Sequence, residues 1–330
     1  MSAADERLRR LIRHDGPIPV ARFMAEANAH YYATRDPLGV AGDFTTAPEI
    51  SQMFGELIGL WLVEVWRARG APAPVRLVEL GPGRGTLMAD ALRAARLDPD
   101  FIAAAELHLV ETSPTLVRAQ RARLPQARHA AAFAEVPEGP LLLVANEFFD
   151  ALPIRQFVRV GSAWRERRVG LDGERFVFSE AGEVSETAPA REAAMAEVAR
   201  RIAAFGGAAL VVDYGHARSA PGDTLQAVRG HCFHDPLALP GEADLTAHVD
   251  FEALAKAARA EGAAVHGPVG QGAFLRALGI EARAAALRPK GGAAVDAALA
   301  RLTDDDAMGS LFKVLAVTSL DLPAPPGFAP

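Results

Sequence analysis

The stretch Val75–Thr86, VRLVELGPGRGT, indicates the fold of this 330-residue chain more clearly than any other part. Residues 75–80 form a short apolar run typical of a buried strand, and a glycine-rich turn at 81–86 separates it from a helical pattern at 87–97. Ligands of open α/β sheets bind where strands end, and glycines there let the backbone approach a ligand without a Cβ clash. The turn is therefore a candidate ligand loop, although an ordinary glycine-rich turn has the same pattern.

The alternation of strands and helices continues beyond this stretch. Further strands are predicted at 106–111, 141–147 and 208–215. Strands joined through helices pair in parallel, so we expect an α/β fold with a doubly wound, Rossmann-like sheet. Short alternating runs between 154 and 182 indicate an inserted β-hairpin, and 311–320 is predicted to be a late edge strand or an inserted antiparallel strand.

The N-terminal part is helical instead. Short helices are predicted at 5–13 and 19–30, and one long helix is expected to begin after Thr46 and to end at Gly70. The apolar face of that helix would bury either a core or a second copy in a homodimer, through Ile50, Phe54, Trp61 and Trp66. The expected organisation is an N-terminal helical cap, 1–70, that would bind an acceptor, followed by a core, 71–330, with an insertion at about 154–205.

Composition narrows the class of protein. Lys and Arg number 35 and Asp and Glu 41, so the net charge of −6 argues against a partner that is a nucleic acid. The single cysteine, Cys232, excludes a disulfide framework and a cysteine-based zinc site. The most apolar helical stretch is interrupted by Gln52, Glu56 and Glu64, so we expect no membrane span and, without a secretion signal, a cytoplasmic protein.

An acidic residue after the second strand suggests the ligand. Glu111 lies 28 residues beyond Gly83, where its carboxylate can accept hydrogen bonds from both hydroxyls of a ribose, although a solvated strand end would explain it as well. The turn reads G-x-G-x-G, not the G-x-G-x-x-G of dinucleotide-binding folds. That spacing suits S-adenosylmethionine, which has no pyrophosphate, and favours a methyltransferase over a nicotinamide-dependent oxidoreductase.

The end of a third strand is also polar. NEFFDALP (146–153) follows LLLVA, so its polar groups are expected to face the methyl group of the cofactor. A helix N-terminus capped by Asn146, with the phenylalanines in the core, would explain the same letters, and the two interpretations are compatible.

These pieces together resemble the MidA family of S-adenosylmethionine-dependent methyltransferases. The matching segments are YYATRDPLGVAGDFTTAPEISQMFGE (31–56), VELGPGRGTLMADALR (78–93), LHLVETSPTL (107–116), NEFFDALPIRQF (146–157), VVDYGH (211–216) and ADLTAHVDF (243–251). The resemblance spans nearly the full chain and implies a class I methyltransferase fold with S-adenosyl-L-methionine as cofactor. Its mitochondrial branch methylates arginine and assists assembly of respiratory complex I, which implies a protein acceptor of the 49-kilodalton-subunit type.

The resemblance also implies a set of site residues. Gly81, Gly83 and Gly85 would form the cofactor loop, with Glu79 at the methionine end and Glu111 at the ribose. The remaining cofactor-binding residues are expected to be Pro82, Thr86, Thr112, Asn146, Phe44 and Thr45. Where relatives place an aromatic residue near the adenine, this chain departs from the family and reads Arg128-His129-Ala130.

An arginine acceptor is cationic and must be oriented, which paired carboxylates do well through bidentate hydrogen bonds. Glu147 is the first candidate for this role, Asp150 the second, and Asp43, on a loop able to close over the site, the third.

Other interpretations are weaker. His231–Asp235 lacks the convergent donors of a zinc site, so no metal is expected. Ser51 and Ser113 lack a nucleophile elbow of the G-x-S-x-G type. His248 could cap a helix or contact substrate. A non-catalytic assembly factor that binds the cofactor and a partner would share all these features, and this alternative stays open.

Overall fold

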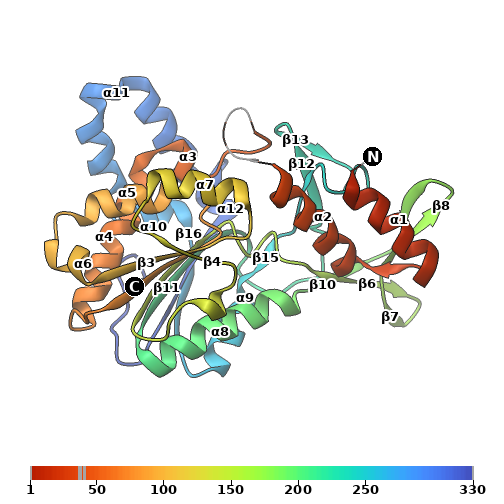
Figure 1. Cartoon of the computed structure of the whole chain (residues 1–330), viewed down its shortest axis with the longest axis horizontal. Helices are drawn as coiled ribbons and strands as arrows, with labels where there is room; N and C mark the ends of the chain where they lie inside the picture. The colour runs from red at the N-terminus through yellow and green to blue at the C-terminus, as the bar shows by residue number, and fades with distance from the viewer. Residues whose placement is uncertain (1, 36–38, 40–41, 329–330) are drawn as a thin grey trace.

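The computed structural model describes residues 2–35, 39 and 42–328 and contains a central twisted sheet in the order β16-β17-β11-β5-β2-β3-β4 (Figure 1). Its strands are β2 Val75–Leu80, β3 Ala105–Val110, β4 Arg128–Ala130, β5 Leu141–Asn146, β11 Gly207–His216, β16 Ala264–Gly270 and β17 Phe312–Thr318, and a short β15, Val249–Asp250, also pairs with β11. The strands from β4 to β11 pair in parallel, and β17 lies antiparallel between β11 and β16. The doubly wound sheet is therefore confirmed, and the last strand is an inserted one, not an edge.

Helices cover both faces of this sheet, which explains why its strands are apolar throughout. In β5, Leu142 and Val144 pack on one side and Leu141 and Leu143 on the other. One layer contains α4 Gln52–Ala68, α5 Thr86–Ala95, α6 Pro99–Ala104, α10 Gln271–Ala277 and α11 Ile280–Thr303. The other contains α8 Pro189–Phe205 and α9 Phe251–Ala260. The connections α7 Pro114–Arg123, the 3-10 turn Phe133–Glu135 and α12 Met308–Leu311 complete this part.

The expected long helix before the first strand is wrong in one respect. The structure has two helices, α3 Ala47–Ile50 and α4, separated by Ser51 in an extended conformation (φ −160°, ψ 139°). The Ser51 hydroxyl accepts a hydrogen bond from the Met53 amide at 3.2 Å, so a side-chain cap starts a new helix where the apolar pattern alone suggested continuity.

The apolar face of α4 packs inside the chain. Phe54 and Trp61 are each 1% exposed and Trp66 4%, so of the two expected alternatives this face buries a core.

A second lobe lies beside the sheet (Figure 1). It joins α1 Ala3–Asp15 and α2 Val20–Thr34 to three small antiparallel sheets, where a single hairpin was expected. These are β10-β6-β7 (Val184–Thr187, Arg155–Val160, Ala163–Glu166), β1-β8-β9 (Ile18–Pro19, Arg168–Asp172, Arg175–Phe178) and β13-β12-β14 (Cys232–His234, Gln226–Arg229, Asp244–Thr246). One apolar cluster joins the helices to the second and third of these sheets, with Leu8, Phe23, Val169 and Leu245 buried together. Residues 189–205, which the sequence pattern placed in the insertion, form α8 on the central sheet.

Candidate functional site

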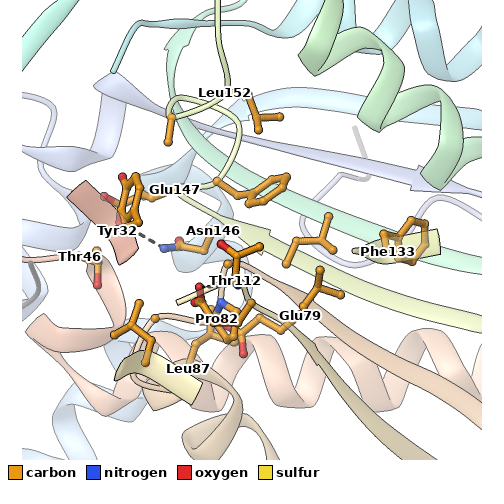
Figure 2. Close-up of a pocket in the computed structure, with 18 of the residues that line it drawn as sticks. Tyr32, Thr46, Glu79, Pro82, Leu87, Thr112, Phe133, Asn146, Glu147 and Leu152 are labelled. Carbon is orange, nitrogen blue, oxygen red and sulfur yellow. Dashed lines mark hydrogen bonds between the residues drawn. The ribbon is translucent and has the colours of Figure 1, made fainter. Parts of the chain in front are cut away.

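A pocket of about 520 Å³ opens at the carboxyl ends of β2, β3 and β5, between the two lobes (Figure 2). The structure brings ten of the predicted site residues to its lining: Phe44, Glu79, Gly81, Pro82, Gly83, Thr86, Glu111, Thr112, Asn146 and Glu147. Asp43, Thr45, Gly85 and Asp150 are not among the lining residues. The strand ends named from the sequence therefore border one pocket.

The glycine turn bends sharply out of β2. Gly81 and Gly83 have φ of 62° and 54°, a left-handed conformation that a residue with a side chain adopts only with strain. A Cβ on Gly81 would lie 3.0 Å from the Phe148 ring. Gly85, at φ 74°, starts α5 and faces Leu124. Gly81 and Gly83 therefore shape the pocket wall, and Gly85 is the N-cap of α5 behind it.

Gln120 in α7 connects this turn to the next strand end. Its side chain is fully buried, and Nε2 donates to the Gly83 carbonyl at 2.6 Å and to Glu111 Oε2 at 3.4 Å. Sequence reasoning missed it because a glutamine inside a helix belongs to no motif. The sequence signal available was its position four residues after Leu116, which places both side chains on one face of the helix. That face is the buried one.

Two carboxylates end the adjacent strands β2 and β3. Glu79 is 3% exposed, and its Oε2 has no hydrogen-bond partner among the described residues. Burial, helped by the charge of Glu111, raises the pKa of Glu79 well above its usual range. Glu111 Oε1 accepts from the amides of Thr112 (2.9 Å) and Ser113 (2.8 Å), and burial raises its pKa as well. An unpaired buried carboxylate oxygen facing a pocket is suited to a ligand's donor group.

Glu147 follows β5 in a strained conformation. Its φ of 51° is left-handed, which is costly for a residue other than glycine. Oε1 accepts from the Ala47 amide (3.3 Å) and from Asn146 Nδ2 (3.2 Å), whereas Oε2 accepts no hydrogen bond within the described part of the chain. Burial raises the pKa of Glu147 to about 8, with a further contribution from Asp150. Strain together with a shifted pKa in a pocket is typical of a functional residue.

Asp150 lies behind the pocket, not in it. Its side chain is 5% exposed, and the amides of Phe149 and Asp150 donate to Asp213 Oδ2 at 3.0 and 3.2 Å. Arg191, buried in α8, donates to the Asp150 carbonyl at 2.8 Å. These contacts hold the turn that follows Glu147, so Asp213, within β11, supports the geometry of that turn.

Asp43 is occupied elsewhere. Its Oδ2 accepts from the Tyr31 hydroxyl at 2.6 Å, and its Oδ1 from the Gly230 amide at 2.7 Å. The carboxylate thereby joins α2 to the turn between β12 and β13 and is not presented to the pocket. Of its neighbours, Phe44 and Thr46 line the pocket, and Thr45 does not.

The N-terminal helices supply a wall of the pocket through residues that the sequence did not single out. Asn28, Tyr32 and Glu49 line the pocket. Tyr32 donates its hydroxyl to Asp244 Oδ1 at 2.7 Å, and Glu49 Oε1 accepts from the Thr86 hydroxyl at 2.5 Å. The spacing of Asn28 and Tyr32, four residues apart on one helix face, was the only local hint.

Phe133 lies at the opposite end of the pocket from Tyr32 and Glu147 (Figure 2). Arg128–Ala130 forms β4, and Phe133 follows three residues later. The guanidinium carbon of Arg201 stands 4.2 Å from the ring centroid. The pocket therefore has an aromatic residue at this end, three residues beyond Arg128-His129-Ala130.

The other candidates lie outside the pocket lining. His248 packs edge-on against Tyr214 at 5.6 Å, and its carbonyl accepts from Arg191 at 2.7 Å. Ser113 caps α7. Among the described residues, no group of histidine, cysteine and acidic side chains could hold a metal, and no helix is long and apolar enough to span a membrane.

The order of the sheet, its inserted antiparallel strand and the glycine loop after β2 define a class I methyltransferase. A family described as "Putative S-adenosyl-L-methionine-dependent methyltransferase" matches residues 57–269. The chain belongs to this family, the MidA methyltransferases, whose cofactor is S-adenosylmethionine. This membership removes the nicotinamide-dependent oxidoreductase from consideration.

Individual relatives are similar to this chain over most of its length. The mitochondrial protein arginine methyltransferase NDUFAF7 homolog of Drosophila melanogaster is 39% identical, over 94% of this chain and 84% of the relative. The Homo sapiens protein arginine methyltransferase NDUFAF7 is 37% identical, over 84% and 74%. A COG1565 superfamily member from Burkholderia thailandensis, crystallised with S-adenosyl-homocysteine, has a TM-score of 0.86 at 28% identity, covering 98% of this chain and 94% of that one.

Proposed function

We propose that this methyltransferase transfers a methyl group to an arginine side chain of a protein acceptor. The observation that carries the proposal is the Glu147 carboxylate at the end of β5, with one oxygen committed and the other without a partner among the described residues. The relatives that are protein arginine methyltransferases support the same acceptor chemistry.

We place the cofactor in the pocket as follows. Glu79 Oε2 and Asn146 Oδ1 are buried oxygens without a partner among the described residues, which suits the ammonium group of the methionine part. In our proposal Gly81 and Gly83 border that part, Glu111 accepts from the ribose hydroxyls, and Phe133 contacts the adenine. The bound cofactor supplies a methyl group on a sulfonium.

Glu147 orients the acceptor. An entering guanidinium favours the charged form of this carboxyl, because an opposite charge at close range lowers a raised pKa. The carboxylate then accepts the hydrogen bonds that align one acceptor nitrogen with the methyl group, and alignment alone removes much of the barrier. Asp150 and Asp43 act indirectly. Asp150 supports the turn after Glu147, and Asp43 supports the adjacent Phe44.

The acceptor that the family resemblance indicates is the 49-kilodalton-type subunit of respiratory complex I, or its bacterial counterpart. We propose this subunit as the first acceptor to test.

The test combines labelled cofactor with mass spectrometry. Purified protein is incubated with radiolabelled S-adenosylmethionine and a lysate of cells that lack this protein. Labelled proteins are then searched for methylated arginine. We expect Glu147→Gln to reduce transfer by about 100-fold or more while cofactor affinity changes less than about twofold. Glu261→Gln, an exposed glutamate at the C-terminus of α9, is the matched control with full transfer.

Three results would contradict the proposal. Label on lysine or on no protein would exclude an arginine acceptor, and the second of these would favour a cofactor-binding assembly factor. Equal losses of transfer and of cofactor affinity in Glu147→Gln would assign Glu147 to the cofactor or to the fold.

A further inference from the structure

Tyr32 and Glu147 both line the pocket, at the end opposite Phe133 (Figure 2). Its hydroxyl donates to Asp244 Oδ1 at 2.7 Å, and Asp244 is 4% exposed. Because the hydroxyl is hydrogen-bonded to a buried carboxylate, the ring is the part of Tyr32 that can contact a ligand in the pocket.

The ring is held firmly in place. One turn earlier in α2, Asn28 Nδ2 donates to the carbonyls of Ala151 (3.0 Å) and Leu245 (2.7 Å), and Oδ1 accepts from the Leu245 amide at 3.2 Å. The Tyr31 ring packs against Tyr32 edge-on, at 5.2 Å between centroids and 80° between planes. The helix is thus hydrogen-bonded to the turn after Glu147, which fixes the ring relative to the carboxylate.

We propose that Tyr32, oriented by Asp244, forms an aromatic wall of the acceptor end and that, together with Glu147, it selects a planar guanidinium over a lysine ammonium. The inference rests on the proposed function and names the residue that determines its specificity. A guanidinium stacks on an aromatic face while its edge meets a carboxylate in a fork, and it is weakly hydrated. An ammonium is a compact, strongly hydrated charge that gains less from either contact.

The test measures binding of two small probes, N-acetyl-arginine amide and N-acetyl-lysine amide, to the full chain saturated with S-adenosylhomocysteine. Chemical-shift titration gives each affinity without requiring turnover. We expect the wild type to prefer the arginine probe by about tenfold, and Tyr32→Leu to reduce that preference to about twofold or less, as expected for loss of a desolvated cation–π contact. Tyr32→Phe retains the ring but not the hydrogen bond to Asp244, and it should keep a preference intermediate between the two.

Trp164→Leu is the matched control, because Trp164 is a 44% exposed aromatic on β7 outside the pocket lining, and it should behave as the wild type. An unchanged preference in Tyr32→Leu, or no arginine preference in the wild type, would overturn the inference. A parallel loss of S-adenosylhomocysteine affinity in Tyr32→Leu would also overturn it, by assigning Tyr32 to the cofactor.

Failure of the proposed function gives a different pattern. In that case Glu147→Gln would bind the arginine probe as well as the wild type does. If Glu147→Gln loses the arginine probe and Tyr32→Leu does not, only the role of Tyr32 is wrong.

Discussion

The two walls of the pocket are built in different ways. The proposed cofactor wall, Glu79 to Gly83 with Glu111, comes from two neighbouring strand ends and is held by backbone amides and by Gln120. The proposed acceptor wall, Tyr32, Glu49 and Glu147, comes from three distant parts of the chain. Its side chains are held by hydrogen bonds to Asp244, to Thr86 and to the Ala47 amide. In our proposal, a general cofactor is therefore bound by local backbone geometry, whereas the surface for a particular acceptor depends on tertiary contacts.

The largest effect is expected for a substitution in the cofactor wall. Gly83→Val forces a branched side chain into a left-handed position at the pocket, so S-adenosylmethionine affinity measured by calorimetry should fall by about 100-fold or more. Gly173→Val is the matched control, since Gly173 has φ of 57° in an open turn, with no atom within 4 Å of the place that a Cβ would take. Comparable binding losses in both variants would mean that general instability, not the pocket, causes the effect.

The pH dependence reports on the acceptor wall. The free protein holds Glu147 protonated below its raised pKa of about 8, and the acceptor needs the carboxylate, so kcat/KM for the acceptor should rise with pH and level off above about 8. The expected slope below that pH is about tenfold per unit. A profile already flat at about pH 6.5 would show that ionisation of Glu147 does not limit the reaction.

Gln120 tests how the cofactor wall is supported. Gln120→Leu removes the hydrogen bond to the Gly83 carbonyl and should weaken S-adenosylmethionine binding by about tenfold, the effect of roughly one hydrogen bond. Gln271→Leu is closely matched, because Gln271 is also fully buried and donates to a backbone carbonyl, that of Leu302 at 2.9 Å, outside the pocket lining. Unaltered affinity in Gln120→Leu would show that the turn keeps its shape unaided.

The smallest effect concerns stability. Burial raises the pKa of Asp244 from 3.8 to about 8, so folding favours the protonated carboxyl, and this contribution, complete below pH 3.8, is lost as the pH rises through about 8. Asp244→Asn keeps an acceptor for the Tyr32 hydroxyl and cannot ionise, so its thermal midpoint should fall less between about pH 5 and 9 than that of the wild type, by about a few degrees. Parallel curves for the two proteins would exclude a destabilising charge at Asp244.

Prediction from sequence succeeded where the signal was local. Strand periodicity located β2, β3, β5 and β11, and the glycine turn located the pocket. It was wrong at Ser51, where a single hydroxyl ended one helix and began another. Gln120, Phe133 and Tyr32 were missed because each acts through a partner far away in the chain.

The amino-acid sequence by itself determined the sheet, its binding edge and the family, because alternation, glycine conformation and strand-end acidity are properties of short segments. Only the tertiary structure decided which carboxylates face the pocket. It buried Asp150 behind the turn, engaged Asp43 with Tyr31 and engaged one oxygen of Glu147 with the Ala47 amide while the side chain lines the pocket. Burial and hydrogen-bond pairing depend on the packing of segments that the chain brings together from a distance, and no local pattern encodes them.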